Sequence, residues 1–316
     1  MRGFFITNLK KYMKKKVLGI GEIVLDKVHQ LASFPSEGEK IVSRTIQMSL
    51  GGPVPSALIL LSRLGVECTL VACVANDEAG KIVTSILEGE GVRLVQEVSD
   101  HTSVNTVLVN GMNGSRTVIK DIDSGTLEKK IQNKIIDSAD LILCDRHEPD
   151  IVLDAIGRKK RGVQVIMDPS VDCSVRTMEL LRNVSVPIVP IETMKTLFPN
   201  NTIQDGAKKL SLALDKTVII TMGEYGCAVC NRESFAIHSP PRVNVIDTLG
   251  AGDIFRGGFA FGVLNGWDLD RTVQFANMVA AMQCTKLGNS TAIPTKQEIN
   301  TFQKTTNQLA NSISLV

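Results

Sequence analysis

Short apolar runs separated by longer amphipathic stretches recur along most of this chain. The runs have the length of buried strands and occupy residues 17–24, 68–74, 141–144, 163–167, 186–189 and 217–221. The stretches between them, such as residues 53–64 and 79–89, have the length and spacing of helices. Apolar strands that alternate with helices are typical of a parallel sheet covered on both faces. The pattern therefore predicts an α/β fold that closes with three helices, which start near Gly252, Asp270 and Thr295.

Two segments depart from this alternation. Residues 27–49 and 103–119 alternate polar and apolar positions, which predicts short strands with one face open to water. The second segment is interrupted at 110–114 by Asn-Gly-Met-Asn-Gly, a sequence typical of a hairpin turn. Both segments are therefore expected to form strands outside the parallel sheet.

Composition and charge exclude several classes of function. The chain has 316 residues, of which 35 are basic and 33 acidic, and the small net charge of +2 gives no electrostatic case for binding nucleic acid or a membrane. Aromatic residues make up only 4% of the chain, so a surface that stacks bases is not expected. The length fits a single domain with a small appendage as well as two domains.

The cysteines indicate a reducing compartment. Their number is odd, at 7, and no secretory leader is apparent, so we expect the protein to be cytoplasmic. Cys227 and Cys230 have the spacing of a redox or metal pair. However, they lie in an apolar segment that is predicted to be a strand, with the two thiols on opposite faces. No second cysteine or histidine pair completes a zinc site, so we interpret this pair as packing.

The N-terminal segment, residues 1–16, is basic and contains only a short apolar run. That run is too short to cross a bilayer or to form a secretory core. We expect residues 1–16 to be an extension and residues 17–316 to form the folded domain. Because Met13 closely precedes the first strand, the sequence is also consistent with translation that begins at Met13.

The strongest chemical signal is Asp-Thr-Leu-Gly-Ala-Gly-Asp at residues 247–253. Small residues at 250–252 let backbone N–H groups approach a negatively charged oxygen, and the apolar run from Ile254 predicts a helix whose positive end faces it. Asp253 would lie beside this cradle. Phosphoryl transfer needs donors that hold the migrating charge and a carboxylate that accepts the proton of the attacking hydroxyl. A glycine-rich helix start would explain the glycines, but not an aspartate on each side of them.

This segment resembles the second signature of the PfkB family, the ribokinase-like carbohydrate kinases. Gly-Gly-Pro-Val-Pro-Ser-Ala at residues 51–57, followed by an apolar helix that runs to Arg-Leu-Gly at 63–65, resembles the first signature. The resemblance extends from residue 17 to about residue 299. It implies a ribokinase-like three-layer α/β/α fold with a mainly parallel central sheet and a small β-sheet lid, which residues 27–49 and 103–119 would form.

The resemblance also implies the roles of individual residues in catalysis. Asp253 matches the catalytic base of the family, and the anion hole matches Gly250, Ala251 and Gly252. Asp247, together with the loop that follows residue 281, resembles a monovalent-cation site, which implies activation by potassium.

On the acceptor side, Asp26 matches the aspartate that accepts hydrogen bonds from sugar hydroxyls, although a turn aspartate leading into the lid would explain it as well. Gly51 and Gly52 would let the backbone approach the sugar. Ser56 stands where the family usually carries an asparagine, which changes the available hydrogen bonds and leaves the substrate open.

Arg146 follows an apolar strand and is expected at the carboxyl edge of the sheet, where ligands bind in open α/β folds. Ketohexokinases and bacterial kinases of sulfonated fructose carry an arginine in a similar place. A guanidinium there would suit a carboxylate, a sulfonate or a vicinal diol. The alternative is a surface arginine paired with Asp145 or Glu148.

For the nucleotide, the family uses a glycine turn beneath the phosphates and adenine of ATP, which matches Thr221, Gly223 and Gly226. Asn277, in a later helix, matches the family's position near the adenine. The family also carries an N-x-x-E motif that helps to organise Mg²⁺. Here Ile191 and Met194 occupy those positions, with Glu192 as the nearest acid. Because Mg²⁺ can be held largely by the nucleotide, the expected cofactors are still ATP and Mg²⁺, together with K⁺.

The expected activity is ATP-dependent transfer of the γ-phosphoryl group to a hydroxyl of a monosaccharide, either a ketose or a related polyol. Two alternatives stay open. They are a nucleoside kinase of the same fold and, because of Ser56, Ile191 and Met194, a catalytically impaired binding or regulatory relative. A nicotinamide-dependent dehydrogenase is disfavoured, since residues 19–24 lack the third glycine of G-x-G-x-x-G. The expected partners are a sugar and ATP, and a homodimer formed through the lid stays open.

Overall fold

The computed structural model describes residues 14–122 and 124–313. Its larger sheet consists of β1 (Lys16–Ile20), β4 (Glu67–Ala75), β5 (Val92–Ser99), β8 (Leu141–Cys144), β9 (Gln164–Met167), β10 (Val186–Pro190), β11 (Val218–Thr221), β12 (Cys227–Cys230) and β13 (Phe235–His238). The strand order is β13-β12-β11-β10-β9-β8-β1-β4-β5. All the pairs from β5 to β11 are parallel, and β12 and β13 pair antiparallel at one edge. The carboxyl ends of the parallel strands therefore meet along one edge of the sheet.

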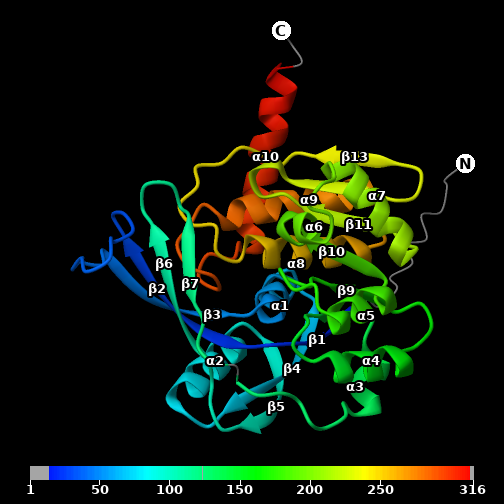
Figure 1. Cartoon of the computed structure of the whole chain (residues 1–316), viewed down its shortest axis with the longest axis horizontal. Helices are drawn as coiled ribbons and strands as arrows, with labels where there is room; N and C mark the ends of the chain where they lie inside the picture. Colours follow the sequence, from blue (N-terminus) through cyan, green and yellow to red (C-terminus); the bar gives the residue numbers. More distant parts are fainter. Residues whose placement is uncertain (1–13, 123, 314–316) are drawn as a thin grey trace, which may run out of the picture.

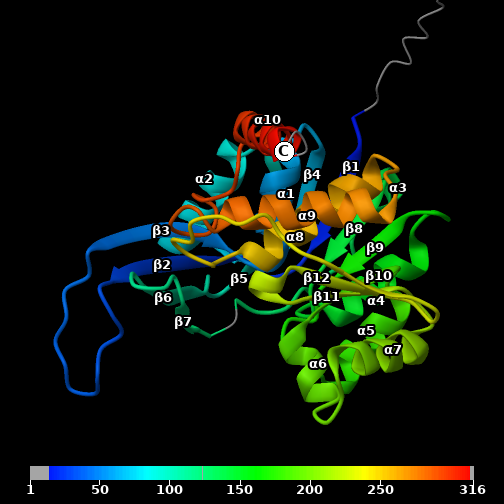
Figure 2. The ribbon, with the colours of Figure 1, turned by 90° about the horizontal axis from the view of Figure 1, so that it is seen from above.

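Helices cover both faces of this sheet, as Figure 2 shows from above. On one face lie α1 (Pro53–Arg63), α2 (Glu78–Gly89), α8 (Ala251–Leu264), α9 (Leu269–Gln283) and α10 (Lys296–Ile313). On the other face lie α3 (Asn133–Ser138), α4 (Pro149–Arg158), α5 (Val175–Asn183), α6 (Ile191–Leu197) and α7 (Ile203–Leu214). Alternate residues of β1 enter the two cores, since Val17 packs on the first face and Leu18 on the second. The predicted three-layer fold is confirmed, and the last three helices begin next to the predicted residues.

A second, four-stranded sheet lies to one side of the first (Figure 1). Its strands are β2 (Val24–Leu31), β3 (Thr45–Gly51), β6 (Val104–Asn110) and β7 (Arg116–Ile119), in the order β3-β2-β6-β7. We call it the lid sheet. Its inner face carries the buried residues Val28, Val107 and Val109, which pack against Leu249 and Leu287. The lid sheet thus rests on the segment that leads into α8.

The sequence predicted a single strand over the apolar run at 17–24. In the structure this run is instead divided between two sheets. β1 ends at Ile20, and β2 begins at Val24 in the lid sheet. The chain changes direction at Gly21, where an added Cβ would lie 2.2 Å from Asp145 Oδ2. Asp26 therefore lies within a lid strand rather than in a turn after the first strand.

Other boundaries differ in detail. β5 was not predicted, because this edge strand is half exposed and mixes charged with apolar residues. β1 begins at Lys16, the last residue of the expected extension. Residues 1–13, including the second candidate start at Met13, lie outside the described residues. Within the described part of the chain, no helix is long and apolar enough to cross a membrane.

The prediction for the cysteine pair is confirmed. Cys227 packs in the core under α8 and α9, whereas Cys230 packs in the core on the opposite face of the sheet. Burial raises the pKa of Cys227 to about 12. The spacing of these cysteines therefore follows from the alternation of a buried strand and not from redox chemistry.

Candidate active site

The N-terminus of α8 forms a cradle of backbone N–H groups. Gly250 caps the helix in a left-handed conformation, with φ of 76°. A Cβ at this position would lie only 2.4 Å from Asn289 Oδ1, so the turn requires glycine for both its conformation and its space. Ala251 and Gly252 begin the helix, where backbone N–H groups lack helical partners and the helix dipole favours negative charge. Asp253 lies in the same turn, with its side chain 19% exposed.

Asp26 lies opposite this cradle, on lid strand β2, and is only 4% exposed. Asn105 Nδ2 on β6 donates a hydrogen bond of 3.1 Å to Asp26 Oδ1. The neighbouring strand makes room for the carboxylate at Gly51, where an added Cβ would lie 2.2 Å from Asp26 Oδ2. The side chain of Asn289 lowers the pKa of both Asp26 and Asp253, which places it near both carboxyls.

The electrostatics of the two carboxyls suit proton transfer near neutral pH. Burial raises the pKa of Asp26 to about 6, against the hydrogen bond from Asn105. Burial likewise raises the pKa of Asp253 to about 7, with a further rise from the charge of Asp26 and an opposing effect of Arg116. A carboxyl group with such a pKa can exchange a proton near neutral pH, as a general base must.

Arg116 on lid strand β7 is a site residue that the sequence analysis missed. Its Nη1 donates hydrogen bonds to Thr248 O at 3.1 Å and to Thr248 Oγ1 at 2.8 Å, at the start of the turn that leads to Gly250. Its charge lowers the pKa of both Asp26 and Asp253. The lid sheet therefore brings a cation next to the cradle.

A further polar cluster lies where β1 and β8 end. His147 lies 3.2 Å from Asp145 Oδ1 and 3.2 Å from Glu22 Oε2. Burial alone would raise the pKa of Asp145, but the hydrogen bond and charge of His147 hold it below its usual value. A cavity of about 50 Å³ beside this cluster is lined by residues that include Gly21, Glu22 and Glu148. This small cavity lies at the end of the first strand, and neither Asp253 nor the cradle at the start of α8 lines it.

Arg146 emerges at the carboxyl edge after β8, as predicted. Its Nε is buried and has no hydrogen-bond partner among the described residues. The two candidate surface partners are bound elsewhere, since Asp145 faces His147 and Glu148 accepts the N–H of Leu127 at 2.9 and 3.1 Å. The simple surface pair is thus not the arrangement found.

The first signature contributes backbone rather than side chains. Gly52 caps α1 with φ of 103°, and an added Cβ would lie 2.4 Å from the carbonyl oxygen of Glu22. The hydroxyl of Ser56 donates to Gly52 O at 2.8 Å, and Ser56 is 0% exposed. Ser56, expected to bind the acceptor, instead offers it no open atom, because its short side chain bonds within its own helix.

At the turn that the sequence predicts to bind a nucleotide, Thr221 ends β11, and an exposed turn with Gly223 follows it. Gly226 closes the turn with φ of 83°, where an added Cβ would lie 2.1 Å from His238 O. Asn277 is 3% exposed and donates from Nδ2 to His238 O at 2.8 Å. Its amide fixes the segment after β13, so any effect on a nucleotide at this turn would be indirect.

Asp247 has both carboxylate oxygens occupied by the backbone. Oδ1 accepts the N–H of Leu249 at 2.9 Å, and Oδ2 accepts the N–H of Gly288 at 2.9 Å. Gln283 Nε2 donates to Leu249 O at 3.1 Å and to Asn289 O at 2.9 Å, across the same two turns. Asp247 therefore joins the turn before α8 to the 288–290 turn, and a cation there would have to bind to backbone carbonyls.

The positions of the missing N-x-x-E motif are used for packing. Met194 is 4% exposed, and its Cε lies 2.7 Å from where a Cβ of Gly206 would be, so α6 and α7 meet closely there. Ile191 packs against the same core, while Glu192 is exposed. Within residues 14–122 and 124–313, no cluster of three or more His, Cys, Asp or Glu side chains could hold a metal ion. A protein-bound metal therefore fits poorly here, whereas a metal carried by a nucleotide is compatible with the site.

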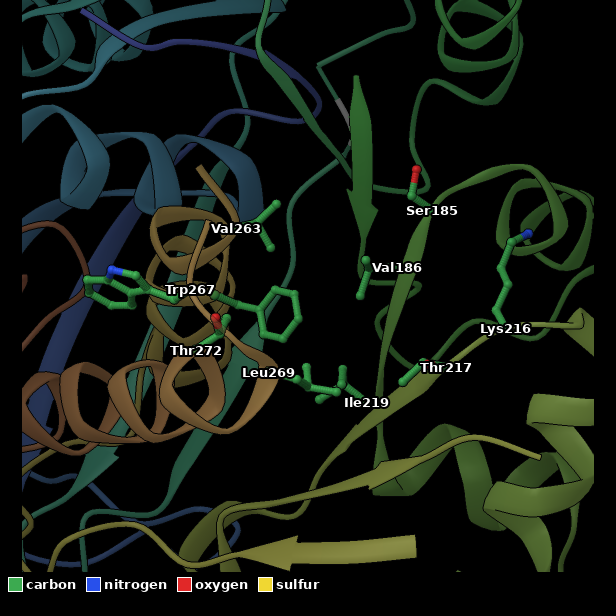
Figure 3. Close-up of a pocket in the computed structure, with 10 residues that line it drawn as sticks. Ser185, Val186, Lys216, Thr217, Ile219, Val263, Trp267, Leu269 and Thr272 are labelled. Atoms are coloured by element: carbon green, nitrogen blue, oxygen red, sulfur yellow. The ribbon is translucent and has the colours of Figure 1, made fainter. Parts of the chain in front are cut away.

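A larger cavity of about 360 Å³ lies elsewhere, at the amino ends of β10 and β11 (Figure 3). Val263 and Trp267 form one side, with Val186 and Ile219 across from them. Lys216, the one charged residue among the described residues of its lining, is engaged elsewhere, because Lys216 Nζ donates to carbonyl oxygens at the end of α5. This cavity lies at the opposite edge of the sheet from Asp253 and is not the candidate active site.

Four residues of the site escaped the sequence analysis, namely Asn105, Arg116, Asn289 and Arg256, which forms an ion pair with Asp253. Three of them lie far from the signatures in sequence and reach the site only through the lid sheet and the last turn. Arg256 carried a readable signal, since a charged residue stands alone in the apolar helix after Asp253.

Comparison with known proteins agrees with this geometry. A sequence model described as pfkB family carbohydrate kinase matches residues 14–296. The ribokinase of Haemophilus influenzae is 28% identical over 311 residues, which cover 92% of this chain and 99% of that protein. The aminoimidazole riboside kinase of Salmonella typhimurium is 26% identical over 277 residues, or 80% of this chain and 87% of that protein. A structure of Arabidopsis thaliana ribokinase complexed with ribose and ATP has the same fold, with a TM-score of 0.77 at 21% identity over 92% of this chain and 98% of that chain.

Proposed function

Because the chain belongs to the pfkB family of carbohydrate kinases, and so transfers phosphate to an alcohol group of a sugar or nucleoside, we propose that it phosphorylates a monosaccharide with ATP. The acceptor that we propose is a ketose or a related polyol. The proposal rests on one observation: two buried carboxyl groups lie close enough to influence each other's charge. They are Asp253, at the N–H cradle of α8, and Asp26, on the lid sheet. Asp253 is available to accept the proton of the acceptor hydroxyl, and Asp26 is available to orient the hydroxyls of the acceptor.

In the proposed reaction, the acceptor hydroxyl gives its proton to Asp253 while its oxygen forms a bond to the γ-phosphorus. The bond from that phosphorus to the bridging oxygen breaks, and ADP leaves with the electron pair. Backbone N–H groups at Gly250, Ala251 and Gly252 hold the charge of the transferring group, and Arg116 adds a cation from the lid sheet. Asp26 and the backbone at Gly52 orient the acceptor, so positioning supplies much of the rate.

The turn at Thr221, Gly223 and Gly226 is the proposed contact for ATP, with Asn277 holding its far side through His238. Mg²⁺, when bound with ATP, neutralises charge on the phosphates. Since the N-x-x-E positions are apolar here, we propose that the nucleotide supplies most of the ligands of Mg²⁺. Activation by K⁺ at the backbone carbonyls near Asp247 stays a prediction.

Arg146 supports the choice of acceptor. A guanidinium with a buried Nε that lacks a partner among the described residues can donate to a diol or to an anionic substituent of the acceptor. A nucleoside acceptor is the second candidate, favoured by the similarity to a riboside kinase. A screen of ATP consumption over ketoses, aldoses, polyols, sugar acids and nucleosides separates these classes. Turnover with none of them would favour the binding or regulatory alternative.

The assignment of the base has a direct test. In Asp253→Asn the side chain keeps its size but cannot accept the proton as a carboxylate does. We expect turnover to fall by roughly two to four orders of magnitude, the usual contribution of a general base. Steady-state kinetics with the best acceptor measure this loss, and ATP affinity serves as the control for folding. Near-normal turnover would remove Asp253 from its proposed role.

The outer face of the lid sheet supports a homodimer. Side chains of β3 and β7 on that face are apolar and exposed, with Ile46 at 57%, Met48 at 41% and Ile119 at 56%. β3 and β7 are the two edge strands of the lid sheet, and several exposed apolar groups on one face of a sheet are typical of an interaction surface. We therefore propose that a second copy of the chain covers this face.

A further inference from the structure

Arg256 is a buried charge next to the candidate base. It lies in α8 between apolar neighbours and is only 6% exposed. Burial of a guanidinium is costly unless ion pairs and hydrogen bonds compensate for lost hydration. Burial lowers the pKa of Arg256 to about 10, so the group stays charged at neutral pH. A fully charged side chain in this position therefore needs anionic partners.

Its two partners come from different parts of the fold. Arg256 Nη2 pairs with Asp253 Oδ1, one helical turn earlier, and Arg256 Nη1 pairs with Asp168 Oδ2. Asp168 follows β9 and is 8% exposed. Its Oδ1 accepts the N–H of Ser170, a residue with a positive φ of 57°, and Ser170 O accepts the hydroxyl of Thr193 on α6. Asp168 is thus a fixed anchor for the guanidinium.

We propose that Arg256 is a positioning residue for Asp253. It holds one carboxylate oxygen of Asp253 and favours the ionised form, and its second ion pair, with Asp168, limits this effect. The inference rests on the proposed function, in which Asp253 is the base. Arg256 contacts only Oδ1, so Oδ2 lies outside this pair and can face the acceptor hydroxyl. Asp168 binds the other terminal nitrogen of the guanidinium and so shares its charge. Without this sharing, Arg256 would lower the pKa of Asp253 further, which would weaken Asp253 as a base.

Other charges also face Asp253. Arg116 on β7 favours its ionised form, whereas Asp26 on β2 and Asp145 after β8 oppose it. Without Arg256, Asp253 would face two carboxylates and only one cation, Arg116. The ionised form of Asp253 would then be disfavoured. Removal of the charge of Asp168 has the opposite effect, since Arg256 then pairs with Asp253 alone. The two substitutions must therefore shift the protonation of the base in opposite directions.

The test is the pH dependence of kcat/KM, which reports the base in the free enzyme. In Arg256→Met we expect the acidic limb to move up by about one to three pH units, with activity partly recovered at high pH. In Asp168→Asn the limb moves down. Arg63→Met is the matched control, because Arg63 also forms a partly buried ion pair, with Glu90, and makes no ion pair or hydrogen bond with Asp253, Asp168 or Asp26. It should lower the unfolding temperature and leave the limb in place.

The inference is overturned if Arg256→Met and Asp168→Asn both lose activity equally at all pH values while the acidic limb of kcat/KM stays in place. Arg256 would then have only a structural role. If Arg256→Met does not fold, Asp168→Asn and Arg256→Lys carry the test, because Arg256→Lys retains the charge and should keep the limb close to its original pH. Failure of the proposed function is distinguishable, since it would leave Asp253→Asn active. Failure of this inference alone would leave Asp253→Asn inactive and the limbs unmoved.

Discussion

At the scale of single residues, Asp26 is held in a state that costs stability. Its folded pKa of about 6 lies above the ordinary 3.8, so the folded protein binds this proton more tightly than the unfolded chain. The ionised group therefore destabilises the fold above pH 6, and the penalty disappears as the pH falls from about 6 toward 4. A buried carboxylate kept at such a cost is typical of a functional position.

Asp26→Asn should remove that penalty while keeping an oxygen that accepts from Asn105. We expect the free energy of unfolding at pH 8 to rise by on the order of 3 kcal/mol, at about 1.4 kcal/mol per unit of pKa, with a smaller gain toward pH 4. Urea unfolding at both pH values measures the effect. Asp137→Asn, an exposed position on α3, is the control and should change little at either pH. A destabilised Asp26→Asn at pH 8 would contradict the prediction.

Arg116 tests the contribution of the lid sheet to the chemistry. Arg116→Ala removes a cation beside the cradle, and we expect kcat to fall on the order of 10²-fold, as when one donor to a developing charge is lost. The acidic limb of kcat/KM should also move up, because Arg116 lowers the pKa of Asp253. Arg93→Ala, on the exposed side of β5, is the matched control. Equal kcat values in the two variants would exclude the proposed role.

At the scale of elements, the start of α8 depends on a glycine for two separable reasons. Gly250 has a positive φ, and an added Cβ would also meet Asn289 Oδ1. Gly266, just after α8, has φ of 65° but no atom within 4 Å of its Cβ position. An alanine at Gly266 would meet only the backbone strain, about 1 to 2 kcal/mol.

We therefore expect Gly266→Ala to lower stability modestly and to leave kcat unchanged. Gly250→Ala should lower stability further and reduce kcat strongly, because the added methyl displaces the side chain of Asn289, which lies near both carboxyls. Thermal unfolding and steady-state kinetics on both variants separate strain from displacement. If kcat falls equally in both, backbone conformation rather than the position of Asn289 controls the site.

At the scale of the whole molecule, the lid sheet has two working faces. Its inner face packs on Leu249 and covers the start of α8, while its outer face exposes Ile46 and Ile119. We expect the protein to sediment as a dimer and Ile46→Glu to sediment as a monomer, because a charge cannot be buried there unpaired. Val175→Glu, at an 86% exposed apolar position on α5, is the control and should not change the mass. A wild-type monomer would disprove pairing through the lid.

The sequence by itself determined the layers of this protein, because continuous apolar runs can be satisfied only inside a parallel sheet covered by helices. It also singled out Asp253 and the small residues at 250–252, since a helix start with small residues and an acid is a local feature. Only the tertiary structure decided which distant side chains share the site. Asn105, Arg116 and Asn289 reach it through lid strands and a late turn, and no local pattern encodes such contacts. Ser56, assigned to the acceptor from sequence, bonds within its own helix because its burial is set by the packing of α1, which its immediate neighbours do not reveal.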